Sequence, residues 1–407
     1  MVNKPKVLAL SYLFPNTAYP NHGIFVFNRL NALSQYADIK VINPIPWSPV
    51  HPYLAQYRSL SSVPLQCQLG NLDVYHPRFF SIPRVLKAFE VATYKTAVLK
   101  TVRQQLAGFD FELIDLHWTF PDLPAGFMLS RSYHKPYLVT LRGMEAFHFQ
   151  DSGSRSRIVA KYLKQANHVI ALSEELKQAS IKLGVESRKH SVVRNGVDTN
   201  QFHFIRQSEA REKLRLEPSE KLIVMVGSLI RRKGFDLVIS ALPEICRVIK
   251  QPLKLYIVGS EGPEGDYRNQ LYQLVRLHGL EDNVIFKGAV NNNQLVYWYN
   301  AADVFCLASR GEGSPNVLTE AIACGCPSVA TDVGAVREII ESEADIGTCV
   351  ASENTAAIAE AIGQLILAVP DRRLNAKKFG CYDWNWCAGQ AFQAYDALLT
   401  DSEKNET

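Results

Sequence analysis

The chain of 407 residues has a hydrophobic fraction of 47%, a charged fraction of 21% and a formal net charge of +4. This length exceeds one ordinary core and predicts two domains, and the composition is typical of a soluble globular protein. No apolar run reaches the ~18–20 residues of a membrane span. The apolar run after Lys6 leads into Pro15 without a small-residue cleavage site, so we expect a buried first strand and a cytoplasmic protein.

The first half of the chain alternates strand-like apolar runs with helical periodicity. Lys6–Leu13 predicts a strand, and apolar residues at helical spacing over Ile24–Tyr36 predict a helix. Asn43–Arg84, rich in Pro, Ser, Tyr and His, interrupts the alternation, and we expect few regular elements there. The alternation predicts a parallel sheet with helices on both faces. Its further strands are expected at Ile39–Ile42, Leu113–His117, Tyr137–Leu141, Val169–Leu172 and Ser191–Val193.

A second alternation begins at Lys221, after a linker predicted at Arg194–Glu220. We therefore predict an α/β fold of two Rossmann-like domains that face each other across a cleft. The second alternation has expected strands at Leu222–Val226, Leu253–Val258, Val284–Phe286, Asp303–Leu307, Ser328–Thr331 and Gly347–Val350. The predicted parts are residues 1–198, residues 199–385, and a C-terminal helix and tail over 386–407 that returns towards the first domain. Neither half carries G-x-G-x-x-G after its first strand, and there is no Walker A motif, which argues against a dinucleotide oxidoreductase or a P-loop NTPase.

The stretch Ser309–Val329 has the pattern of a loop, a helix, a tight turn and a strand. Ser314 is a suitable N-cap, and Pro315 suits the first helical position, where no N–H is needed. The helix is expected to end near Gly325.

The start of this helix is a candidate anion site. The N–H groups of Ser314, Asn316 and Val317 would point out of it, with the positive end of the helix dipole behind them. Glu320 lies one turn after Asn316 on the same face, and Glu312 lies in the loop before the helix. A phosphate site flanked by two carboxylates suits a nucleotide-sugar. An ordinary capped helix with two surface glutamates is the alternative.

The segment from Glu312 to Glu320 resembles the E-x7-E signature of family 4 glycosyltransferases, retaining enzymes of the GT-B fold. Most members read E-G-F-G there. The E-G-S-P-N-V of this chain is more similar to the branch that includes teichuronic-acid and exopolysaccharide biosynthetic transferases. The resemblance covers nearly the whole chain and implies a nucleotide-sugar donor of the UDP or GDP type. The implied donor-binding residues are Gly23, Ser228, Arg232, Lys233, Glu312, Gly313, Ser314, Pro315, Asn316, Val317 and Glu320.

The segment V-G-S-L-I-R-R-K-G leaves the first strand of the second domain and carries the cations Arg231–Lys233. Cations at a helix start oppose the dipole, which favours a ligand over a merely solvated charge run. The segment resembles the family's G-R-L-x-x-x-K-G, so the resemblance implies that Lys233 holds the donor diphosphate. Ser228 stands where most members have arginine, which removes one bidentate phosphate contact. Arg232 and Arg310 are the two candidates to replace it.

In the first domain, L-I-D-L-H-W-T-F-P places His117 at the end of an expected strand, at the edge of the cleft. It resembles the family's H-x-x-x-P histidine, which lies against the donor sugar; a structural histidine is the alternative. Further along, V-T-L-R-G-M-E carries Arg142 and Glu145 where relatives often have His and Asp, and we expect these two on the acceptor side. Gly23 resembles the family's N-terminal glycine loop, where backbone approaches the phosphate or acceptor; a plain turn glycine is the alternative.

The resemblance implies roles for these residues in a retaining transfer. Glu320 accepts hydrogen bonds from the ribose hydroxyls, and the helix-start amides with Lys233 hold the diphosphate and stabilise its charge as the bond breaks. Glu312 holds a sugar hydroxyl, and His117 orients the sugar from the other domain. Two carboxylates could support a double displacement. Because both lie on the donor's binding side, we favour same-face transfer, in which the leaving phosphate takes the acceptor proton.

The chain contains no D-x-D, and its eight scattered cysteines form no zinc pattern, so we expect no metal and no other cofactor. The expected acceptor is a saccharide or lipid-linked saccharide in cell-surface polysaccharide biosynthesis, and nucleic acid is not an expected partner. A sugar-nucleotide epimerase or a phosphorylase with a similar two-domain cleft remains an alternative. A degenerate, non-catalytic transferase is another, because Ser228 and Arg142 depart from the family pattern.

The charge is uneven along the chain. Residues 1–198 carry 23 Lys and Arg against 13 Asp and Glu, whereas the remainder carries 21 against 27. Arg78–Arg103 is basic apart from Glu90, with an imperfect apolar face at Val85, Phe89, Ala92 and Leu99. A basic amphipathic helix with aromatic residues predicts docking on an anionic membrane surface, the inner leaflet. A core-packed helix with a solvated basic face is the alternative.

Overall fold

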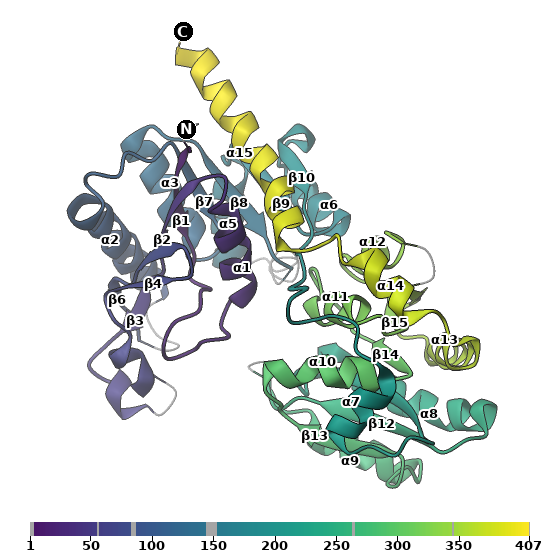
Figure 1. Cartoon of the computed structure of the whole chain (residues 1–407). Coiled ribbons are helices and arrows are strands. Elements are labelled where there is room, and N and C mark those ends of the chain that lie inside the picture. Colours follow the sequence, from purple (N-terminus) through teal and green to yellow (C-terminus); the bar gives the residue numbers. More distant parts are fainter. Residues whose placement is uncertain are drawn as a thin grey trace. The chain divides into compact units, whose positions relative to one another are not determined.

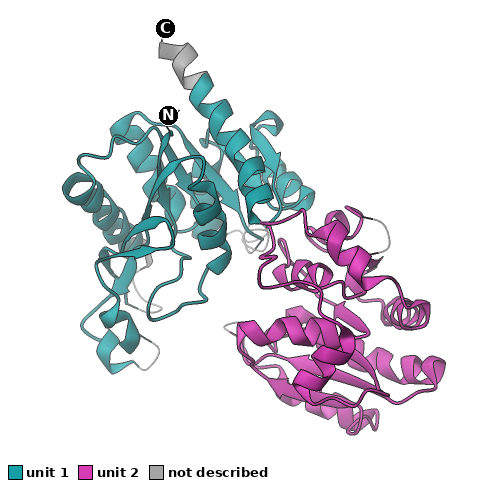
Figure 2. Ribbon diagram, viewed as in Figure 1, with its two compact units in different colours: residues 1–195, 384–407 teal, residues 196–383 magenta. Residues whose placement is uncertain are grey.

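The computed structural model describes residues 4–54, 57–82, 87–143, 153–262, 265–343 and 346–406. The chain forms two compact units, residues 1–195 with 384–407 (unit 1) and residues 196–383 (unit 2) (Figure 2). The chain first passes from unit 1 to unit 2 just after Asn195. The sequence predicted this domain boundary after residue 198. The predicted linker is partly regular, because it contains helix α7 (Gln207–Leu214).

Unit 1 is built on a mostly parallel sheet with the strand order β10-β9-β8-β7-β1-β2-β5-β4 (Figure 1). Only β4 runs antiparallel to its neighbour β5 among the strand pairs described for this sheet. The order reverses between β1 and β7, which is where α/β sheets place ligands. The strands are β1 Lys6–Leu10, β2 Asp38–Ile42, β4 Gln66–Leu69, β5 Leu72–Tyr75, β7 Leu113–Leu116, β8 Tyr137–Leu141, β9 His168–Ala171 and β10 His190–Val192.

Successive side chains of β1 point to opposite faces of the sheet and pack into two different hydrophobic cores, because side chains alternate along a strand. Leu8 and Leu10 pack with α2, α3 and α5, whereas Val7 and Ala9 pack with α1 and α15. The sheet is thus covered on both faces, as the alternating pattern predicted. The helices are α1 Ile24–Leu33, α2 Lys87–Gln105, α3 Asp122–Tyr133, α5 Ser154–Leu163, α6 Glu174–Lys182 and α15 Trp384–Glu406, with a short 3-10 turn at Ser187–Lys189.

The stretch Asn43–Arg84 is more regular than predicted. Besides β4 and β5, it holds the parallel pair β3 (Ile45–Trp47) and β6 (Arg78–Phe80), together with 3-10 turns at His51–Tyr53 and Arg58–Ser62. The strands here are only three or four residues long, which is too short for a clear alternation of apolar and polar residues. The prolines and serines between them therefore led to the prediction of irregular structure.

Helix α2 packs on the sheet through a face other than the one that carries Phe89. Tyr94, Val98 and Val102 are buried in the core, whereas Phe89 is 52% exposed. Val85 lies outside the described residues. Phe89 and Ala92, which belong to the face proposed to dock on a membrane, therefore lie away from the core, and the docking itself stays a prediction.

Helix α15 belongs to unit 1 although it ends the chain. Its Ala388, Ala391 and Tyr395 are buried against the sheet, and the ring of Phe392 stacks on Tyr36 with 5.2 Å between centroids.

Unit 2 has an entirely parallel sheet over the described strand pairs, in the order β13-β12-β11-β14-β15-β16. Val224 packs into the hydrophobic core on one face of this sheet, and its neighbours Ile223 and Met225 pack into the core on the other face. Helices therefore cover both faces. The strands are β11 Lys221–Val226, β12 Leu253–Val258, β13 Val284–Gly288, β14 Val304–Leu307, β15 Ser328–Thr331 and β16 Gly347–Val350. The helices are α7, α8 Phe235–Ile249, α9 Arg268–Leu277, α10 Asn292–Ala301, α11 Asn316–Ala323, α12 Val336–Ile340, α13 Thr355–Ala368 and α14 Arg372–Phe379, with a 3-10 turn η4 at Arg231–Lys233.

Candidate active site

The strand order of unit 2 reverses between the neighbouring strands β11 and β14. The loop after β11 carries Lys233, and the loop after β14 carries Glu312. Because the strands are parallel, both loops emerge at the carboxyl edge of the sheet, where open α/β folds bind their ligands.

Lys233 and Glu312 meet at this edge. The ammonium Nζ of Lys233 donates to Glu312 Oε1 at 2.6 Å, and the hydroxyl of Ser309 donates to the same oxygen at 2.7 Å. The side chains of Lys233 and Glu312 remain 17% and 9% exposed. One oxygen of the carboxylate is thus held by two donors, while the lysine stays accessible to an anion that enters from solvent.

Arg232 and Arg310 differ in what holds them. Arg232 donates to the carbonyl of Gly311 at 3.0 Å, and its Nη1 lies 3.6 Å from Glu312 Oε2. Arg310 instead makes a two-pronged pair with Asp236 at 2.9 and 2.7 Å and a second pair with Glu353. Of the two cations that could replace the arginine missing at position 228, Arg232 is the one beside the Lys233–Glu312 pair.

Two glycines allow the loops to close on this pair. Gly234 has φ 65°, and a Cβ there would lie 1.8 Å from the carbonyl oxygen of Ala308. Gly334 has φ 57°, and a Cβ there would lie 2.4 Å from the carbonyl oxygen of Glu312. Only glycine fits such contacts at a positive φ, so Gly334 holds the backbone around Glu312 and Gly313.

Helix α11 begins one residue later than predicted. Pro315, at φ −74° and ψ 105°, is the N-cap residue and makes no side-chain cap hydrogen bond, and Asn316 is the first helical residue. Pro315 accepts the first helical bond, from the N–H of Leu318 at 3.1 Å. The prediction of Ser314 as N-cap was wrong because proline is extended here and enters the helix only through its carbonyl.

Glu320 lies one turn into α11 and is held by a residue that the sequence analysis missed. The hydroxyl of the fully buried Tyr299, on α10, donates to Glu320 Oε2 at 2.8 Å. Burial raises the pKa of Glu320 to about 7, against the opposing effect of this hydrogen bond. The carboxylate therefore changes its charge near neutral pH, and its hydrogen bond to Tyr299 orients it.

Ser228 lies in the loop after β11, packed against the loop after β12. A Cβ on Gly262 would lie 2.8 Å from the Cβ of Ser228, so the two loops are in close contact. The loop at Gly262 therefore lies directly beside the Ser228 side chain, and an arginine at position 228 would have to extend past this loop.

In unit 1, His117 follows β7 at the strand-order reversal and is fully buried. Its backbone N–H donates to Leu10 on β1 at 3.1 Å. Its Nδ1 accepts from Arg142 Nη2 at 2.7 Å, and its Nε2 lies 2.7 Å from Asp115 Oδ2. Since a guanidinium only donates, the ring proton is on Nε2 and faces Asp115. Burial lowers the pKa of His117, so the ring is neutral.

His117 was predicted at the edge of the cleft, and within unit 1 its side chain is fully buried. Both ring nitrogens face partners within unit 1, and Tyr395 of α15 donates to Asp115 from the far end of the chain. Arg142 is 7% exposed and lies over the ring of Phe25 at 5.1 Å. The cation expected on the acceptor side is thus part of a buried polar cluster.

The remaining predicted positions in unit 1 are Gly23 and Glu145. Gly23 has φ 71° and precedes α1, and a Cβ there would lie 2.6 Å from the backbone of Leu13. The fold of its own loop therefore requires this glycine. Glu145 lies outside the described residues.

Within the described ranges, His, Cys, Asp and Glu side chains do not gather in groups of three or more that could hold a metal ion. Among the helices described, none is long and apolar enough to cross a membrane.

Two Rossmann-like units, one with a lysine, a glutamate and a second helix-borne glutamate at its strand-order reversal, define a protein of the GT-B fold class. Solved structures agree over nearly the whole chain. Sucrose-phosphate synthase from Thermosynechococcus elongatus matches with a TM-score of 0.77 and 22% identity, covering 98% of this chain and 100% of that one. Anabaena HepE, solved in complex with UDP-glucose, matches with a TM-score of 0.72 and 20% identity over 96% and 99% of the chains.

The sequence comparisons then identify the family. Residues 206–379 match the glycosyl transferases group 1, and residues 71–201 match glycosyltransferase family 4. A putative teichuronic acid biosynthesis glycosyltransferase of Bacillus subtilis (strain 168) is 30% identical over 365 residues, 88% of each chain. A D-inositol 3-phosphate glycosyltransferase of Corynebacterium urealyticum is 28% identical over 77% of this chain and 78% of its own. The chain belongs to the family 4 glycosyltransferases, which confirms the predicted family and fold class.

Proposed function

We propose that this glycosyltransferase moves a sugar from a nucleotide-diphosphate sugar to a saccharide or lipid-linked saccharide, with retention of configuration, in cell-surface polysaccharide biosynthesis. The observation that carries the proposal is the contact of Lys233 with Glu312 at the β11/β14 reversal, beside the helix that bears Glu320. The names of the relatives, which include teichuronic acid biosynthesis, and structural neighbours solved with UDP and UDP-glucose support it.

In this proposal Lys233 and Arg232 neutralise the diphosphate. Both cations now face Glu312, and the donor's phosphates would take over one or both of these contacts. The free carboxylate of Glu312 would then hold a hydroxyl of the sugar. Glu320, already oriented by Tyr299, would accept hydrogen bonds from the ribose.

The chemical step needs charge stabilisation more than a protein base. As the bond between the anomeric carbon and the diphosphate oxygen breaks, negative charge grows on the diphosphate beside Lys233 and the α11 start. The acceptor hydroxyl attacks from the same face, and its proton passes to the departing diphosphate oxygen. We propose no metal and no other cofactor, because the lysine, the arginine and the helix supply the positive charge.

His117 keeps a supporting role in the proposal, as a fully buried residue of unit 1 that positions Arg142 and Asp115. Its neutral ring is held between Asp115 and Arg142, so it acts by orientation and not by proton transfer. An acceptor carried on a lipid would explain the basic outer face of α2, where Lys100 and Arg103 are exposed. Each such cation near an anionic leaflet contributes about 1 kcal/mol.

The first test is a thermal-shift screen of UDP-, GDP- and ADP-sugars. A donor present at about 100 times its Kd should stabilise the folded protein by about 2.7 kcal/mol. Transfer should survive EDTA, and NMR of the first product should show the donor's anomeric configuration. An inverted product, or a sugar phosphate formed from inorganic phosphate, would replace the proposal with another reaction.

The membrane part is tested separately by co-sedimentation with liposomes. Binding should require anionic lipid, fall with salt and decrease in Lys100→Glu/Arg103→Glu. If the unmodified protein ignores anionic liposomes at low salt, the acceptor is soluble and the docking proposal fails.

A further inference from the structure

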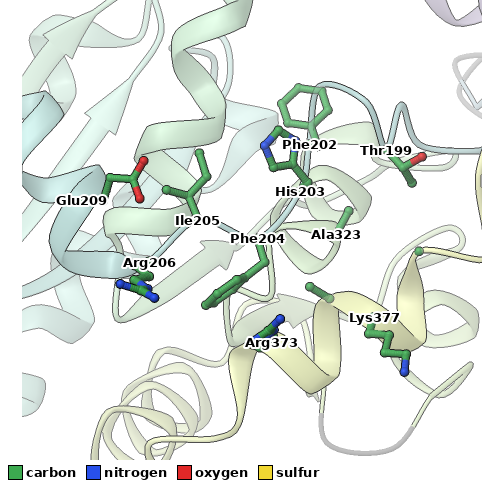
Figure 3. A pocket seen from close by; sticks show the side chains of 12 residues that line it. Thr199, Phe202, His203, Phe204, Ile205, Arg206, Glu209, Ala323, Arg373 and Lys377 are labelled. Atoms are coloured by element: carbon green, nitrogen blue, oxygen red, sulfur yellow. The ribbon is translucent and has the colours of Figure 1, made fainter.

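A second concave site lies in unit 2, lined by residues that none of the donor roles uses. It is a groove of about 700 Å³ between the segment that leads into α7, the end of α11, and α14 (Figure 3). Its lining includes Thr199, Phe202, His203, Phe204, Ile205, Arg206, Glu209, Ala323, Arg373, Ala376, Lys377 and Gly380.

The groove gathers cations that lack counterions. Arg206, Arg373 and Lys377 are exposed, and they take part in none of the ion pairs formed among the described residues. Glu209 is the single carboxylate in the lining. Residues 196–383 carry 20 Lys and Arg against 24 Asp and Glu, so this is a positive groove on an acidic unit. An anion is the ligand that such a surface attracts.

The spacing of the charges favours an extended ligand over a compact phosphate. Figure 3 shows Arg206 and Lys377 at opposite sides of the groove, with Arg373 between them and the ring of Phe204 beside Arg373. The nearby start of α14 is capped by its own Asp371, which accepts from the N–H of Leu374 at 3.0 Å. The usual helix-start cradle for phosphate is therefore occupied.

We propose that this groove binds an acidic saccharide chain, with carboxylates on the cations and a sugar ring on Phe204. Arginine pairs with carboxylates in a two-pronged geometry, and the apolar face of a pyranose packs on an aromatic ring. Since the chain is a glycosyltransferase, a saccharide is the polymer that it meets. The groove would hold a segment of acidic polymer away from the donor.

The groove lining is distinct from the residues assigned to the donor, and the buried ring of Tyr299 links Phe202 of the lining to Glu320. Phe202, in the groove lining, contacts Tyr299 edge-on with 6.0 Å between centroids, and the hydroxyl of Tyr299 donates to Glu320. Because the lining contains none of the residues assigned to the donor, UDP should not displace a ligand from the groove.

The test is binding of a fluorescent oligogalacturonate, measured at low salt with the full chain. Arg206→Ala/Arg373→Ala/Lys377→Ala should weaken binding about tenfold, because three exposed charge pairs are lost. The control Lys213→Ala/Arg276→Ala/Lys287→Ala removes the same charge from exposed positions elsewhere in unit 2 and should stay within twofold. Thermal unfolding verifies that both variants are folded.

Four outcomes overturn the proposal, and a neutral-sugar control provides a fifth. The four are no binding by the unmodified protein, equal weakening in the two triple variants, displacement by UDP, and equal or tighter binding of tripolyphosphate or poly-glutamate. A neutral maltooligosaccharide should not bind, and equal binding of that sugar would show that the cations are irrelevant. Because binding is read directly, the result stands apart from whether transfer from any donor is found.

Discussion

Lys233 with Glu312 in unit 2, and Arg142 with His117 in unit 1, are both cation-centred contacts at the carboxyl edge of a parallel sheet. They differ in exposure. Lys233 and Glu312 are 17% and 9% exposed, whereas Arg142 is 7% exposed and His117 is fully buried, so the clearest difference is between the two cations. In unit 1, α15 reaches this edge through Tyr395, which donates to Asp115. Similar topology therefore produces two different edges. The edge of unit 2 at Lys233 and Glu312 is open to a ligand, whereas the edge of unit 1 is a sealed polar cluster formed by Arg142, His117 and Asp115.

The difference matters because accessible and sealed charges respond differently to substitution. A partly exposed cation can exchange a protein carboxylate for a ligand phosphate, so its removal should appear in kinetics. A sealed cation has no such alternative, so removal of its partner should appear in stability.

The largest expected effect is on the open edge. Lys233→Ala should lower kcat by about 10²–10³-fold, since one preorganised positive group facing the leaving diphosphate is lost. Arg231→Ala is the matched control, because Arg231 is in the same 3-10 turn but exposed. Steady-state kinetics decide the point. A change in KM alone would make Lys233 a binding residue without a role in the chemical step.

The sealed edge should respond in the opposite way. His117→Ala should lower the free energy of unfolding by about 3 kcal/mol, because the buried guanidinium of Arg142 loses an acceptor, while UDP affinity stays within twofold. His117→Gln offers a replacement oxygen and should recover part of the loss. Urea denaturation measures both variants. Unchanged stability with a large loss of transfer would return His117 to direct contact with the sugar.

The same residue should give unit 1 a dependence on pH. Burial lowers the pKa of His117 in the folded state, so the unfolded chain binds a proton first as the pH falls below about 6.5. Its contribution to stability is therefore present above that pH and decreases on acidification. The decrease should be smaller in His117→Gln.

Donor affinity should also depend on pH, through Glu320. With a pKa of about 7, this side chain is mostly protonated at pH 6 and ionised at pH 8. If the carboxylate accepts from the ribose, affinity should rise by up to about tenfold over that interval. Glu320→Gln should bind more weakly and show no such rise, whereas Glu360→Gln, on the exposed side of α13, should behave like the unmodified protein. Calorimetric titration of UDP at both pH values tests this, and a flat profile for the unmodified protein would remove the ribose assignment.

Much of this fold could be predicted from local sequence. The strands at Tyr137–Leu141, Leu253–Val258, Ser328–Thr331 and Gly347–Val350 coincide with the predicted ranges, since buried parallel strands are short apolar runs bounded by loops. The E-x7-E spacing placed Glu320 correctly on α11.

The partners of these residues could not be predicted. Tyr299 reaches Glu320 from another helix, and Tyr395 reaches Asp115 across 280 positions. Such pairs depend on how elements pack, and no spacing within one element encodes them. The same reason hid the burial of His117, whose position after a strand is equally consistent with an exposed edge.

The smallest expected effect separates Arg232 from Arg310. Arg232 lies beside Glu312, so Arg232→Ala should weaken UDP affinity about fivefold, which is typical of one partly exposed charge pair. Arg310 is held by Asp236 and Glu353, so Arg310→Ala should leave UDP affinity within twofold and lower the free energy of unfolding by about 1 kcal/mol. Calorimetry gives the UDP affinity of both variants, and urea denaturation gives their free energies of unfolding.

The reverse pattern would mean that Arg310 leaves its ion pairs when the donor binds and supplies the contact that Ser228 lacks. In that case the open edge of unit 2 would rearrange on binding, and it would differ from the sealed edge of unit 1 in mobility as well as in exposure.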